Sequence, residues 1–374
     1  MLLAHDPTIT VPAWPIRGRL LCGLKGLAAA RFGKRQDVTL ATTALEPVLP
    51  TARGPLSMAV INLLTERAPR YRLDRIEASI EDSAPYGIDV QLSLYVCYEL
   101  HCRGFSGVDP GWEWNPGLLH LRSRLEDAFL TAVRRDVGLL GGTAEEEMRR
   151  LSASPDAESA PPQYLRRAGT WQQMREYFVH RSLYHLKEGD PHAWAIPRLT
   201  GQTKAWFAAA EFDEIRADDG ENVHQRLFTD LMVAAGLDPT YLAYLDMVPA
   251  ETLAVVNLMS MFSLHRQHRG AAVGHFAANE ITRSPSAQGL VDALNRMQAP
   301  NECRAFYRRN AEVDGSHGRM VRARVVGDLL GREPELESDV VFGMRAFGVV
   351  EGRLASHLTR CWSAGLDSLR HPVN

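Results

Sequence analysis

The sequence feature that most constrains the fold is the apolar stretch from residue 249 to residue 281. It opens with Pro249-Ala-Glu-Thr-Leu-Ala-Val-Val-Asn-Leu-Met-Ser-Met-Phe262 and offers few polar positions for a solvated face. A helix that is apolar almost all round is normally buried. The chain shows no alternating strand pattern, no glycine-rich phosphate loop and no internal repeat. We therefore predict an all-α fold with this helix in its interior.

Apolar spacing and capping residues predict further helices on both sides of this stretch. Residues 115–137 carry leucine and phenylalanine at intervals of three and four. Asp190 suits an N-cap and Pro191 the first turn of a helix over 191–215. Gly236 suits the C-terminal end of the helix predicted over 221–235. The remaining predicted helices start at residue 55 or cover 86–102, 164–188, 221–235, 286–297, 302–330 and 334–369.

Changes in composition along the chain predict its division into domains. Residues 1–54 are rich in Pro, Gly and Thr, which favours an irregular arm. Residues 55–152 form a predicted N-terminal helical subdomain. Residues 153–163 form a polar, proline-rich linker without periodicity. Residues 164–374 form the predicted main helical bundle.

Composition and charge exclude several classes of partner. The formal net charge is −3 at pH 7, and no basic block is interleaved with aromatic residues. We therefore expect neither a nucleic-acid surface nor an anionic-membrane surface. No run approaches the roughly 20 apolar residues of a membrane span, and Met1-Leu-Leu-Ala-His-Asp-Pro7 lacks the pattern of a secretory signal. The near-neutral charge leaves a small molecule as the expected substrate. The five cysteines include no Cys-x-x-Cys pair, which predicts reduced thiols in a cytoplasmic protein.

The late helix carries the first candidate site. If residues 302–330 are helical, Asn310, Asp314 and His317 lie at i, i+4 and i+7 and share one face. Bundle proteins present metals from an acid and a histidine spaced three apart. The chain has a second such pair, Glu221 and His224, and either pair taken alone is more often a solvated helix face. A further carboxylate favours a metal site. Glu280 ends the long apolar helix, where an unpaired carboxylate costs several kcal/mol unless a cation or a hydrogen-bond donor compensates it.

Residues 164–374 then resemble the haem-oxygenase-like superfamily of di-iron oxidases and oxygenases, also described as iron-containing redox enzymes. The pattern of that family is Glu, a variable gap and His on early helices, then Glu on a central helix, then His-x-x-x-Asp-x-x-His on a late helix. An extra early Glu occurs in some N-oxygenating members. The matching positions here are Glu214 and His224, then Glu280, then Asp314 and His317, with Glu188 as the extra acid.

The resemblance implies a haem-oxygenase-like bundle with an N-terminal helical extension, two Fe(II) ions per chain and O2 as co-substrate. Glu214 and His224 would hold one iron together with position 310, and Glu280 would bridge to the second or join it. Asp314, His317 and Glu188 would hold the second iron. The implied activity is that of a non-haem di-iron oxidase or oxygenase of specialised metabolism. Its substrate would be a small amine- or carboxylate-bearing metabolite, changed by N-oxygenation, desaturation or oxidative cleavage. Whether the protein uses an external electron donor and whether it forms a homodimer stay open.

Asn310 departs from the family pattern, which has a histidine there. Its neutral amide oxygen is a weaker ligand for a transition metal than imidazole. Either the first iron has fewer strong ligands, or only the second is bound, or the chain is a degenerate member that acts as a binding or interaction module. His185 or His192 could replace the missing histidine, against the alternative of ordinary hydrogen-bonded histidines. A metal-free relative and a haem oxygenase with His180 as the proximal ligand are further alternatives.

Overall fold

The computed structural model describes residues 46–65, 79–153, 160–187, 189–215, 224–312 and 320–373, and of residues 212–215 and 312 only the backbone. These residues are mostly helical and include no strand, which confirms the predicted all-α fold. Residues 45–374 cluster into one compact unit. The predicted arm lies almost entirely outside the described residues, as does the middle of the predicted linker, so the division into domains stays a prediction.

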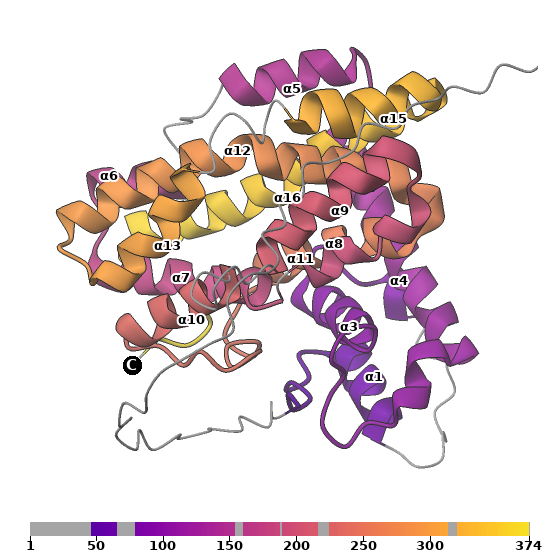
Figure 1. Ribbon diagram of the computed structural model, residues 1–374. Coiled ribbons are helices and arrows are strands. Elements are labelled where there is room, and N and C mark those ends of the chain that lie inside the picture. Colours follow the sequence, from indigo (N-terminus) through magenta and orange to yellow (C-terminus); the bar gives the residue numbers. More distant parts are fainter. Residues whose placement is uncertain are drawn as a thin grey trace, which may run out of the picture. The chain divides into compact units, whose positions relative to one another are not determined.

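Figure 1 shows the arrangement of the described helices. None of those described is long and apolar enough to cross a bilayer. The first group is α1 (Pro55–Thr65), α3 (Ile88–Glu99), α4 (Pro116–Val137) and α5 (Ala144–Ala153). The second is α6 (Pro161–Arg167), α7 (Trp171–His185), α8 (Asp190–Ala193), α9 (Gly201–Ile215) and α10 (His224–Ala234). The third is α11 (Ala250–Leu264), α12 (Arg269–Arg296), α13 (Asn301–Glu312), α15 (Gly327–Arg332) and α16 (Glu337–Ser363).

The core is organised around α11, α12 and α16. In α11 every residue from Thr252 to Ser263 is buried, as the apolar pattern predicts. It packs against α3, α12 and α16, so that α3 of the first group shares this core. α12 lies along α16 (Figure 1).

Two glycines let α12 and α16 approach closely. A Cβ at Gly274 would overlap the carbonyl oxygen of Val340, and a Cβ at Gly343 would overlap the carbonyl oxygen of Ala271. The contact is reciprocal, because each helix places a glycine against the backbone of the other. Close backbone approach of this kind requires glycine. It fixes the position of α12, which carries Glu280.

The single helix predicted over residues 249–281 is wrong. α11 ends at Leu264, His265 is extended, and a short 3-10 turn over Arg266–His268 precedes α12. The stretch from His265 to Arg269 is polar, and a ring nitrogen of His265 lies 3.1 Å from Glu126 Oε1 on α4. This tertiary contact and the exposure of residues 266 and 267 turn the chain out of the core. α12 then continues through Pro285 and absorbs the separate helix predicted over 286–297.

Other predicted helices are subdivided. The helix predicted over 191–215 is split into α8, a 3-10 turn at Ile196–Arg198 and α9. Pro197 lacks a backbone N–H, and Gly201 has a φ of 58° that ends regular helix. Residues 164–188 divide into α6 and α7, because Thr170 begins a new helix with a capping box to Gln173. In contrast, the helix at 115–137 is confirmed, with Asn115 as its N-cap.

The late helix predicted over 302–330 is described at its two ends. α13 ends at Glu312, a π-helical segment spans Val321–Val326, and α15 follows. Residues 313–319 lie outside the described residues. The predicted common face of Asn310, Asp314 and His317 therefore stays a prediction.

Candidate functional site

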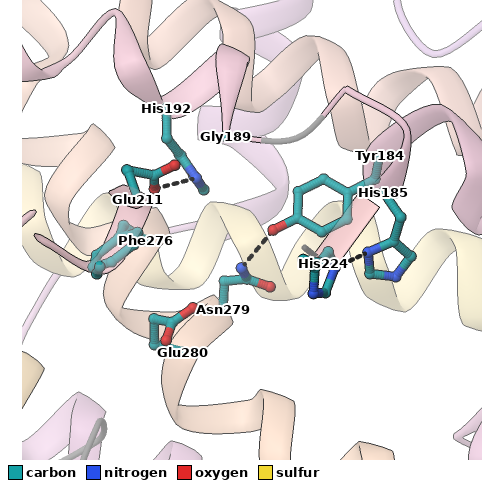
Figure 2. A pocket seen from close by; sticks show the side chains of 10 residues that line it. Tyr184, His185, Gly189, His192, Glu211, His224, Phe276, Asn279 and Glu280 are labelled. Atoms are coloured by element: carbon teal, nitrogen blue, oxygen red, sulfur yellow. Dashed lines mark hydrogen bonds and ion pairs between the residues drawn. The ribbon is translucent and has the colours of Figure 1, made fainter. Parts of the chain in front are cut away.

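One pocket brings histidine and glutamate side chains from several helices together (Figure 2). It lies between the end of α7, the turn into α8, and helices α9, α10 and α12. The lining residues are Tyr184, His185, Gly189, His192, Ala210, Glu211, His224, Phe276, Asn279 and Glu280. Three imidazoles and two carboxylates thus meet in one place.

Two imidazoles face each other on one side of the pocket. Nδ1 of His185 lies 3.1 Å from Nε2 of His224. Figure 2 marks this contact with a dashed line. His185 is the last residue of α7, and His224 is the first residue of α10. Burial, followed by the charges of His224, Arg283 and Arg181, lowers the pKa of His185 well below its usual value. His185 is therefore neutral at physiological pH.

Aromatic side chains hold this pair in place. The ring of Phe306, on α13, lies 5.0 Å from the ring of His185 and 4.8 Å from that of His224, measured between centroids. Phe228, on α10, lies 4.7 Å from His185. Phe228 and Phe306 are both fully buried. The two imidazoles consequently sit against an apolar wall.

The opposite side of the pocket holds a buried histidine–carboxylate pair. His192 Nδ1 lies 3.2 Å from Glu211 Oε1, and each side chain is only 4% exposed. A Cβ at Gly189 would overlap Glu211 Oε2, so the glycine gives this carboxylate room beside the turn into α8. Behind His192, the ring of His275 lies 5.7 Å away, and burial and then the charge of His192 lower its pKa well below the usual value.

α12 supplies the third side of the pocket. Phe276, Asn279 and Glu280 lie at i, i+3 and i+4 and therefore on one face. Asn279 donates a hydrogen bond of 3.1 Å from Nδ2 to the hydroxyl oxygen of Tyr184. The Glu280 carboxylate is 5% exposed and pairs with Arg283 one turn further on, at 3.2 Å. Arg283 thus compensates part of the charge of a carboxylate that burial alone would disfavour.

The predicted ligands have different outcomes. His224 and Glu280 line the same pocket. Asn310 is buried on α13, at 6% exposure, and is not among the lining residues. Glu188, Asp314 and His317 lie outside the described residues, and Glu214 lies on α9 where only the backbone is described. Among the described side chains, no group of three or more His, Cys, Asp or Glu is placed to hold a metal ion. The seven-ligand set stays a prediction.

Glu211, Tyr184 and Asn279 are pocket residues that the sequence did not reveal. Glu211 precedes the predicted ligand Glu214 by three positions on α9, and that helical spacing was the available signal. Asn279 adjoins Glu280. Tyr184 carried no local signal, because its hydroxyl group meets Asn279, 95 positions further along the chain, only in the folded protein.

The donor types in the pocket fit iron. Imidazole suits iron among the transition metals, and carboxylates supply the anionic oxygens that stabilise its oxidised states. His185, His224, Glu211 and Glu280 provide both kinds of donor on three of the surrounding helices and the end of a fourth. Facing helices of a bundle are the usual source of such ligands.

Residues 175–350 match the model of a family described as iron-containing redox enzyme. The matched segment contains the whole pocket lining and all seven predicted ligands. It thereby supports a general iron-dependent redox function. The chain has no match among curated proteins.

Proposed function

We propose that the chain is a non-haem iron oxidase or oxygenase, and the match of residues 175–350 to a family of iron-containing redox enzymes supports this proposal. It uses O2 to oxidise a small amine- or carboxylate-bearing metabolite. N-oxygenation, desaturation and oxidative cleavage are the reaction types that the family resemblance suggests. The pocket between α7, α9, α10 and α12 is the proposed site.

The observation that carries this proposal is the meeting of His224 and Glu280 in one pocket. These two predicted ligands are 56 positions apart in the sequence and lie on different helices. The other candidate donors in the same pocket, His185, His192 and Glu211, were not part of the predicted set. A concentration of imidazoles and carboxylates in a largely buried pocket is costly unless partners compensate it. A bound cation is one such partner.

Ferrous iron, when bound, would supply electrons for the reduction of O2. The residues of the chain have separate tasks. His224 and Glu280 would bind the metal, with Glu188, Glu214, Asp314 and His317 as the further proposed ligands. Phe276 and the apolar wall around His185 would limit the access of water, which protects reactive species from side reactions.

Two hydrogen-bonding groups of the pocket lining would orient a substrate. The Tyr184 hydroxyl and the Asn279 amide face the pocket together (Figure 2). The hydroxyl can both donate and accept, and the amide oxygen can accept. A small metabolite with an amine and a carboxylate offers complementary groups to both.

Iron binding followed by O2 consumption tests this function. The protein would be purified without O2, loaded with Fe(II), desalted and measured by elemental analysis. O2 uptake would then be followed with a panel of amino acids and related amines. Iron retention with substrate-dependent O2 uptake is the expected result. Absence of iron retention would exclude the proposed oxygenase and favour the alternative of a binding or interaction module.

A further inference from the structure

The position of Asn310 raises the question of which side chain replaces an imidazole there. Asn310 lies one helical turn after Phe306 on α13, and residues at i and i+4 share a helix face. Phe306 contacts the rings of both His185 and His224. The face of α13 that leads to position 310 therefore faces this pair of imidazoles.

The two ring nitrogens are spaced as ligands of one metal ion are. Nδ1 of His185 and Nε2 of His224 are 3.1 Å apart. Metal–imidazole bonds are about 2.0 to 2.1 Å long, so two imidazoles bound at about a right angle place their nitrogens about 3 Å apart. A hydrogen bond between two neutral imidazoles would explain the same distance, and the two explanations differ in what they predict for metal binding.

The placement of the rings distinguishes His185 from an ordinary buried histidine. His180, also on α7, has both ring nitrogens within hydrogen-bond distance of protein hydroxyls, from Thr252 and Ser368. The Nδ1 of His185 instead approaches a predicted metal ligand and lines the pocket. The same helix thus carries one histidine with structural partners and one aimed at the candidate site.

We infer that His185 binds the metal through Nδ1, beside Nε2 of His224, and supplies the imidazole that Asn310 does not. This inference rests on the proposed function, because it assumes that the pocket binds iron. It changes the expected ligand set of this chain, since the family pattern has a late-helix histidine at position 310. It also means that the asparagine at position 310 does not entail loss of the metal.

The first test compares His185→Gln with wild type in metal binding, without any activity assay. Apo-protein would be titrated with Fe(II) and, as a spectroscopic probe, with Co(II). The matched control is His120→Gln, which removes an exposed histidine of α4. We expect His185→Gln to weaken metal binding at least about tenfold, the scale set even by outer-shell groups of metal sites, while the control matches wild type.

The outcomes separate the two proposals. Equal affinity and equal metal content in wild type and His185→Gln would overturn the role of His185 and leave the proposed function standing. Failure of the wild-type protein itself to bind Fe(II) or Co(II) would overturn both. Unfolding of the apo-proteins would be measured alongside, because a loss of folding is not a loss of a ligand.

A second measurement needs no variant. Wild-type protein with ¹⁵N-labelled histidine would be loaded with Zn(II), a diamagnetic substitute for Fe(II), and its long-range ¹H–¹⁵N spectra recorded. These spectra distinguish a ring bound through Nδ1 from one bound through Nε2. We expect a ring bound through Nδ1, from His185, and a ring bound through Nε2, from His224, beside any signal from the further proposed ligand His317. A spectrum without a metal-bound Nδ1 would overturn the inference.

Discussion

The ammonium group of Lys187 and the carboxylate of Glu99 form an ion pair in the interior, with side-chain exposures of 1% and 0%. Glu99 ends α3, and Lys187 lies two residues after α7, so the pair ties the first helices to the turn that leads into the pocket. The Tyr241 hydroxyl donates a hydrogen bond of 2.9 Å to Glu99 Oε1. Burial lowers the pKa of Lys187, but the charge of Glu99 and the smaller contributions of Tyr241, Tyr95 and Cys102 together outweigh burial and hold this pKa well above its usual value.

Lys187→Met is expected to lower the free energy of unfolding by about 3–5 kcal/mol, because it leaves the buried Glu99 without its counter-charge. Urea denaturation of the apo-protein would measure this change. The double variant Lys187→Met/Glu99→Leu should recover most of the loss, since it removes both charges. A suitable control is Arg124→Met at an exposed pair with Glu81, where we expect a change below about 0.5 kcal/mol. A small effect of Lys187→Met would show that water reaches Glu99.

Gly274→Ala is expected to destabilise the fold by about 1–3 kcal/mol or more, because the added methyl group would overlap the carbonyl oxygen of Val340. Thermal and urea unfolding would measure it. Gly348→Ala and Gly352→Ala on α16 serve as controls, since a Cβ at either position meets no other group. Those two variants should be stabilised by up to about 1 kcal/mol through helix propensity. Similar behaviour of all three variants would contradict the close contact of α12 with α16.

The pH dependence of stability is predicted to depend on His275. Neither of its ring nitrogens has a hydrogen-bond partner among the described residues, and burial, followed by the charge of His192, lowers its pKa well below 6.5. The unfolded state therefore binds a proton near pH 6.5 that the folded state refuses. The titration of His275 therefore leaves the free energy of unfolding unchanged well above pH 6.5. Below that pH this free energy falls by up to about 1.4 kcal/mol per pH unit.

His275→Phe keeps an aromatic ring and removes the titrating group. We expect the variant to be about as stable as wild type or about 1 kcal/mol more stable at pH 7, because two unpartnered nitrogens are removed. Its advantage should grow to about 2 kcal/mol or more near pH 5. Urea denaturation at both pH values measures the difference. Parallel pH profiles for the two proteins would show that His275 does not resist protonation in the fold.

The sequence could predict those parts of the site that follow a spacing along the chain. His224 was found by its spacing from Glu221, and Glu280 by its position at the end of an apolar stretch, and the two do share a pocket. His192 and Glu211 form their buried pair on one side of the pocket, and no periodicity of the sequence encodes this contact. Their contact depends on the turn at Gly189, where the absence of a Cβ leaves room for the carboxylate.

Prediction of the fold from the sequence meets the same limit. The apolar residues of α11 predicted its burial, because burial follows from local composition. The end of the helix at Leu264 did not follow, because the next residue, His265, is held by Glu126 from a distant helix. Local pattern therefore predicted the helical class and the buried face, whereas tertiary contacts set the breaks that turn α12 and its Glu280 toward the pocket.

The last prediction concerns the coupling between His185 and Asn310. If His185 supplies the imidazole missing at position 310, Asn310→His should raise Fe(II) affinity modestly in the wild-type background. In the His185→Gln background it should raise the affinity much more, by at least about tenfold. Fe(II) titration of the four proteins forms a double-mutant cycle, in which side chains that serve one ion show a non-additive free energy. Asn301→His, at the exposed start of the same helix, is the matched control and should leave the affinity unchanged. Strictly additive effects would mean that positions 185 and 310 do not serve the same metal ion.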